Sequence, residues 1–159
     1  MALRSSLILK SPTSDHVDRV RQAVIAIMAG VDQGEDVGEQ ISALNTMTGR
    51  EYDRTYFESF HGHTSIEEFT EEAALPAPRF VSDMTREELI DIVRLAMTVD
   101  PPDSLYYRSL FDKNVPMSGA SGLLDWPEDW KPGQDLSKYD PSPEEIVDRA
   151  TRPGTIIQL

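Results

Sequence analysis

Residues 85–97 read Thr-Arg-Glu-Glu-Leu-Ile-Asp-Ile-Val-Arg-Leu-Ala-Met, the strongest helical pattern in the chain. Its apolar residues recur at steps of three and four, which places them on one face of a helix: Leu89, Ile92, Val93, Ala96 and Met97. Thr85 and Glu88 have the spacing of a capping box, in which each side chain bonds the free backbone N–H of the other residue. Pro101 and Pro102 end the pattern. We therefore predict an amphipathic helix that begins after Thr85.

The same start signal occurs at Ser65 and at Ser142, each followed three residues later by Glu. Helical spacing of apolar residues predicts four further helices, over Ser14–Gly30, Glu35–Met47, Arg50–Phe60 and Leu105–Lys113. Gly30 suits the C-terminal end of the first of these helices. Only two short terminal segments, 6–9 and 155–159, have the composition of strands. The sequence therefore predicts an all-α protein.

A proline-broken connector, residues 74–78, separates two helical stretches. We predict an N-terminal helical region at 1–75, a linker at 76–83 and a second helical domain at 84–159. Residues 115–141 are rich in Gly, Pro, Ser and Asp and predict an ordered loop with one helical turn. Trp126 and Trp130 belong to the main apolar group of this loop.

The chain is strongly acidic, with 28 Asp and Glu against 15 Lys and Arg in 159 residues and a formal charge of −13. Binding to DNA or RNA requires cations that displace counterions from phosphates, so direct nucleic-acid binding is disfavoured. A basic protein surface is the natural complement of this charge, and solubility is the plainer alternative explanation. No apolar run approaches the roughly 20 residues that span a bilayer. We expect a cytoplasmic protein without membrane contact.

The sequence contains no recognisable catalytic motif. It has no cysteine, which excludes thiolate metal sites and thiol nucleophiles, and it has no glycine-rich phosphate loop or dinucleotide fingerprint. His61 and His63, with Glu58 nearby, resemble half of a metal site, although surface or helix-end histidines are the plainer explanation of the pattern. We expect no enzyme activity, no cofactor and no bound metal.

From Met84 onward the order of features resembles the bacterial nuclease-immunity proteins of the colicin and pyocin type. The resemblance is carried by residues 85–93, a short acidic helix, Asn-Val-Pro at 114–116, Ser-Gly-Leu-Leu-Asp-Trp-Pro at 121–127 and Ser-Pro-Glu-Glu-Ile-Val at 142–147. Gly122 stands where the family has Asp, Asp125-Trp126 replaces its aromatic pair, and the loop at 131–140 is longer than in the family.

This resemblance implies a small antiparallel four-helix bundle that binds and blocks a toxin nuclease, with further helices before it. The second helix of this bundle would determine which nuclease is bound. The third helix would supply anchor residues that are shared across the family. The corresponding partner-binding residues here are Asp103, Tyr107, Asp112, Ser121, Asp125 and Trp126.

Two other functions stay open on the sequence. An acidic regulator or DNA mimic would carry carboxylates along a ridge and would act on a DNA-binding protein. An enzyme with an unrecognised helical site would use His61, His63 and Glu58.

Overall fold

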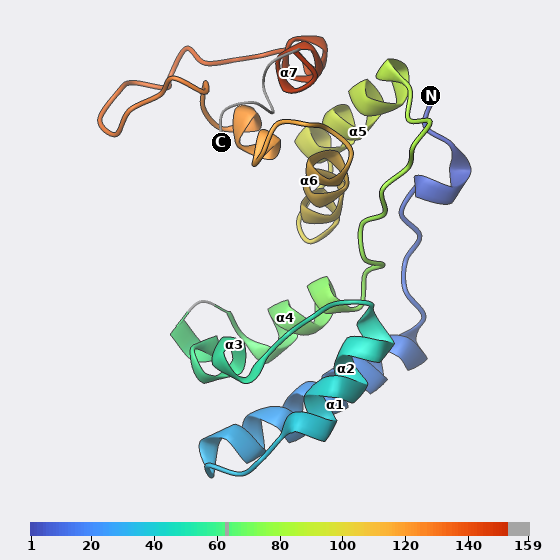
Figure 1. Ribbon diagram of the computed structural model, residues 1–159, viewed down its shortest axis with the longest axis vertical. Coiled ribbons are helices and arrows are strands. Elements are labelled where there is room, and N and C mark those ends of the chain that lie inside the picture. The colour runs from blue at the N-terminus through green and yellow to red at the C-terminus, as the bar shows by residue number, and fades with distance from the viewer. Residues whose placement is uncertain (63, 153–159) are drawn as a thin grey trace. The chain divides into compact units, whose positions relative to one another are not determined.

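The computed structural model describes residues 1–62 and 64–152, and every regular element in these ranges is helical (Figure 1). The α-helices are α1 (Ser14–Asp32), α2 (Gly38–Thr48), α3 (Arg54–Glu58), α4 (Ile66–Ala73), α5 (Arg86–Thr98), α6 (Asp103–Lys113) and α7 (Pro143–Ala150). Short 3-10 helices occupy η1 (Ser5–Leu7), η2 (Phe60–Gly62) and η3 (Ala120–Leu124). The predicted all-α class is confirmed.

The strand expected at residues 6–9 is wrong, because Ser5–Leu7 form a 3-10 turn closed by the Leu7 N–H on the Arg4 carbonyl at 3.0 Å. Leu7 is fully buried by this turn, so packing of one side chain outweighs the strand-like composition of the segment. The other strand candidate, 155–159, lies outside the described residues.

The three predicted helix starts are confirmed by their caps. Complete capping boxes open α5 at Thr85 and α7 at Ser142. Ser65 opens α4 by accepting the Glu68 backbone N–H at 3.2 Å. Each of these side chains satisfies a backbone donor that the first turn of a helix leaves without an intrahelical partner.

The chain divides into two compact units, and the boundary differs from the predicted one at the N-terminus. We call residues 9–77 the insert. We call residues 1–8 with 78–152 the C-terminal unit. Residues 1–8 were expected with the N-terminal region, but their contacts are with the C-terminal unit. The insert therefore interrupts the sequence of the C-terminal unit.

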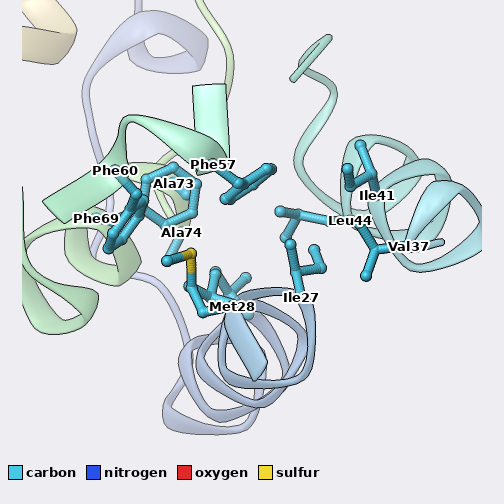
Figure 2. Close-up of a cluster of buried hydrophobic side chains, with 12 residues drawn as sticks. Ile27, Met28, Val37, Ile41, Leu44, Phe57, Phe60, Phe69, Ala73 and Ala74 are labelled. Atoms are coloured by element: carbon cyan, nitrogen blue, oxygen red, sulfur yellow. The ribbon is translucent and has the colours of Figure 1, made fainter. Parts of the chain in front are cut away.

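The insert packs α2, α3 and α4 against α1 around one apolar core (Figure 2). Its fully buried side chains include Ile27, Leu44, Phe57 and Phe60, and burial of each such side chain contributes about 1.5–3 kcal/mol. Helix α1 runs through Gly30 to Asp32, so the predicted helix end at Gly30 is wrong. A Cβ at Gly30 would collide with Val37 Cγ1, which makes close approach the reason for glycine here.

The C-terminal unit packs α6 and α7 against α5, and η3 contacts both α6 and α7. Residues 1–8 form a strap that closes on α5. The Asp91 carboxylate accepts the backbone N–H groups of Ala2 and Leu3, the latter at 3.0 Å. Arg4 donates from Nε and Nη2 to the two oxygens of Glu88, each at 2.7 Å.

The strap widens the buried surface of α5 beyond the predicted stripe. Ile90 and Asp91 are buried, whereas Met97, expected on the inward face, is 42% exposed. The prediction for Met97 is wrong, because the residues that α5 buries are set by the elements around it and not by its apolar period alone.

Candidate functional site

Three of the predicted partner-binding residues meet at the junction of α6 and η3. Asp112, near the end of α6, accepts the Ser121 backbone N–H and the Ser121 hydroxyl, both at 2.7 Å. Arg108, one turn earlier, donates to the Asp125 carboxylate through two nitrogens at 2.9 and 3.0 Å. Arg108 also donates to the Ser121 carbonyl at 3.4 Å. This network holds the start and the end of η3 against α6.

The Arg108–Asp125 pair orients the loop more than it stabilises the fold. Its side chains are 27% and 43% exposed, and exposed ion pairs contribute roughly 0–1 kcal/mol. The hydrogen bonds to Asp125 raise the pKa of Arg108, which keeps the guanidinium charged. The planar contact of two nitrogens with two oxygens fixes the orientation of Asp125 at the end of η3. It therefore also fixes where the following residue is placed.

That next residue, Trp126, is 44% exposed and stacks on Trp130, with ring centroids 5.5 Å apart and planes at 26°. The Trp130 indole N–H donates to the Gln134 carbonyl at 3.3 Å. A Cβ at Gly122 would lie 3.5 Å from Trp126 Nε1, so η3 supports one part of this indole. We call Trp126 and Trp130 the tryptophan pair. It is a rigid aromatic surface of the kind that anchors protein interfaces.

Carboxylates surround the tryptophan pair along the loop. Asp125 is held by Arg108, and Glu128 is held by Arg149 of α7 at 3.1 Å. Asp129 is exposed, and no residue in the described part of the chain forms an ion pair with it. Among the three carboxylates that flank the tryptophans in the sequence, Asp129 is therefore the one without an ion pair in the described part of the chain.

A pocket of about 380 Å³ lies between the same loop and α7. Leu123, Pro127 and Ile146 contribute apolar walls, and Glu128 and Arg149 contribute charge at its edge. The Tyr139 hydroxyl donates a hydrogen bond to the Leu123 carbonyl, and burial raises the pKa of this phenol. Pro127 and Glu128, which line the pocket, follow Trp126 directly in the sequence.

The remaining two predicted site residues lie elsewhere. Tyr107 is only 4% exposed, and its ring packs in the interior against Tyr106 at 5.1 Å. The expectation that Tyr107 meets a partner is corrected, because its helical position faces the core. Asp103 is exposed in the first turn of α6, about 13 Å of helix rise before Asp112 at 1.5 Å per residue. Asp103 therefore lies at the opposite end of α6 from Asp112.

The residue that the site predictions missed is Arg108. A single arginine among the acidic residues of α6 is the only signal that the sequence offers for it. Its partner Asp125 is 17 positions away, so the pairing depends on how η3 folds back on α6.

The described residues hold no group of three or more His, Asp or Glu that fits a metal ion. His63 lies outside the described residues, and so does the side chain of His61. Glu58 is exposed and pairs with Arg54 at 3.7 Å. The alternative of a site at His61, His63 and Glu58 therefore stays a prediction.

Within 1–62 and 64–152, no helix has the length and apolar character needed to cross a membrane. The chain matches no model of a known protein family, no curated protein and no solved structure.

Proposed function

We propose that this protein is an immunity-like inhibitor that binds and blocks a basic bacterial toxin, a nuclease, without catalysis of its own. One observation carries the proposal: Trp126, which is 44% exposed and stacks on the half-buried Trp130, stands on an acidic loop whose start is held by two side-chain contacts to α6. A braced aromatic surface loses little conformational entropy when it binds, which favours a tight interface.

Charge supports the class of partner. A nuclease presents a cationic surface to the phosphates of its substrate, and a chain of net charge −13 associates with such a surface rapidly and in a salt-dependent way. The inhibitor then excludes nucleic acid by repulsion and by bulk. The order of helices α5 and α6, the short turn η3 and the Ser-Pro-capped helix α7 is the order that the immunity-protein resemblance implies, and it supports the proposal.

The proposal is tested by co-expression in a bacterium. The chain is produced together with the protein encoded next to its gene, and separately with a panel of colicin- and pyocin-type nuclease domains. Restored growth, with a purified complex that no longer cuts DNA or RNA, is the expected result. Continued killing by every nuclease, with no complex at micromolar concentrations, contradicts the proposal.

Charge reversal then locates the interface on the cognate nuclease. Asp103→Lys and Asp129→Lys change exposed carboxylates, and each is expected to slow association several-fold and to flatten its salt dependence. Asp112 is unsuitable for this test, because it accepts two hydrogen bonds from Ser121. Glu39→Lys in α2 is the matched control, since it makes the same change of charge in the insert. Equal slowing by all three variants would reveal general attraction without a local interface.

The insert favours a second candidate, an acidic regulator that occupies a DNA-binding protein. It holds 13 acidic and 5 basic residues, a denser negative charge than the rest of the chain. On α4 the exposed carboxylates are Glu67, Glu68, Glu71 and Glu72. This candidate is favoured if the insert inhibits a DNA-binding protein that has no sequence preference. The same inhibition should persist when the tryptophan pair is replaced.

A further inference from the structure

We propose that the tryptophan pair is the receptor for a single arginine side chain of the basic partner, with Asp129 as its counter-charge. This inference rests on the proposed function and specifies the chemistry of its contact. It concerns the exposed indole surface and not the neighbouring pocket, whose charged edge is already occupied by the Glu128–Arg149 pair.

The geometry of the pair suits a flat cation. The two indoles stack with planes at 26° and centroids 5.5 Å apart, Trp130 is half-buried, and 44% of Trp126 is exposed, so the solvent-facing part of the Trp126 indole is open to a flat cation. Indole is the best aromatic partner of a cation, and the planar guanidinium also stacks on a ring. The Trp130 N–H is held by the Gln134 carbonyl and Trp126 rests on Gly122, so both rings are preorganised.

The surrounding carboxylates explain why one cation fits and a broad basic face does not. Asp125 and Glu128 already bind the guanidinium groups of Arg108 and Arg149, which neutralises the loop on both sides of Trp126. Asp129, between Glu128 and Trp130, is the acid of this group for which the described residues offer no guanidinium. One incoming arginine would give Asp129 the guanidinium partner that Asp125 and Glu128 already have.

The net charge of −13 selects a cationic protein as the source of this group, because anionic nucleic acids and anionic lipid headgroups are repelled. Lysine satisfies Asp129 equally well by charge. It stacks less well on the indoles, since its ammonium is compact and strongly hydrated. Preference for arginine over lysine therefore separates a stacking site from simple attraction.

The experiment titrates the full-length protein with hexa-arginine amide and with hexa-lysine amide. The sequence contains two tryptophans, so the indole N–H signals in a proton–nitrogen spectrum report on this pair alone. We expect hexa-arginine to shift both signals with an affinity about two- to fivefold higher than that of hexa-lysine, the range for an exposed cation–π contact. Asp129→Asn should weaken both peptides, and Trp126→Leu should abolish the preference for arginine.

Phe80→Leu is the matched control, because Phe80 is an aromatic residue of the same unit that is 67% exposed. This variant should leave the titration unchanged. Equal affinity for the two peptides, or shifts confined to backbone signals away from the loop, would overturn the arginine site while leaving the inhibitor proposal intact. Toxin neutralisation that fails despite a clear arginine preference would overturn the proposed function and keep this site.

Discussion

Glu88 combines three roles in one side chain. It caps the first turn of α5 through the Thr85 backbone N–H at 3.1 Å, and it holds the Arg4 guanidinium through both carboxylate oxygens. It is also 4% exposed, so these contacts replace water around its charge. The Arg4 hydrogen bonds are the main reason that the pKa of Glu88 falls from 4.5 to about 2.

This lowered pKa predicts the direction of a pH effect. A carboxyl whose folded pKa lies below its unfolded pKa stabilises the fold fully above the unfolded value, and the stabilisation is lost as pH falls toward 2. We expect Glu88→Gln to lower the free energy of unfolding by about 2 kcal/mol at pH 7 and to flatten its decline between pH 5 and pH 2. Urea unfolding across this pH range measures both effects.

Glu87→Gln is the control for this change, because Glu87 is the exposed neighbour on the same helix turn. It should alter stability by less than about 0.5 kcal/mol. A Glu88→Gln variant with the stability and the acid sensitivity of the Glu87 variant would disprove the role of the Arg4 contact.

Tyr107 and Trp126 give a second prediction at the scale of single residues. Tyr107→Ala should cost about 3–4 kcal/mol of unfolding free energy, because it leaves a cavity in the core of the C-terminal unit. Trp126→Ala should cost well under half as much, since 44% of its side chain already faces solvent. Paired denaturation curves test the assignment, and a costlier Trp126 variant would show that the indole belongs to the core.

Helix starts are the best-determined features at the scale of elements. The Ser142 hydroxyl accepts the Glu145 backbone N–H at 3.2 Å, and the Glu145 carboxylate accepts the Ser142 N–H at 3.3 Å. Helix α7 has only eight residues, so the cap serves a large share of its unpaired backbone groups. A change at this residue therefore acts on the whole helix.

We expect Ser142→Ala to destabilise the C-terminal unit by about 1 kcal/mol and to increase amide hydrogen exchange in the first turn of α7. Ser142→Asp, which retains an acceptor of similar reach, should restore most of the loss. Hydrogen exchange resolved along the chain is the measurement. Faster exchange spread evenly over α5 and α6 would instead point to a global effect.

At the scale of the whole molecule, the insert enters and leaves the C-terminal unit through segments that lie close together. Arg79 donates to the Ser6 carbonyl at 3.5 Å, which brings the two edges of the interrupted unit side by side. On the insert, Lys10 and Pro76 line one pocket of about 340 Å³, so its own ends also meet. Such an insertion is compatible with two separate folding units.

Removal of residues 9–77, with a short Gly-Ser linker between Ile8 and Pro78, should therefore leave a C-terminal unit that unfolds in one cooperative transition. The matched comparison is residues 78–159 alone, which lacks the strap. We expect this fragment to be several kcal/mol less stable, because it loses the buried Leu3 and Leu7 and the Arg4–Glu88 pair. Equal denaturation midpoints would show that the strap contributes nothing.

The local features of this fold were predictable from sequence. The helices α1 and α5 and the hydroxyl–Glu signals at Ser65, Thr85 and Ser142 depend on neighbours within four residues, and these predictions are confirmed apart from the helix end at Gly30 and the inward position of Met97. The single helical turn predicted in the loop 115–141 also appears, as η3. Interactions of such short range are set by the chain itself.

Tertiary structure alone decided the burial of Tyr107, the exposure of Met97, the strap on α5 and the contact of Arg108 with Asp125. Each of these features depends on residues between 10 and 90 positions apart, or on which elements cover a helix face. The spacing of apolar residues along one helix contains neither kind of information. An amphipathic pattern states how wide an apolar stripe is, but the neighbouring elements determine which of its residues they cover. The same holds for the candidate site. Its aromatic and acidic residues were recognisable in the sequence, whereas the contact of Arg108 with Asp125 requires η3 to be folded against α6.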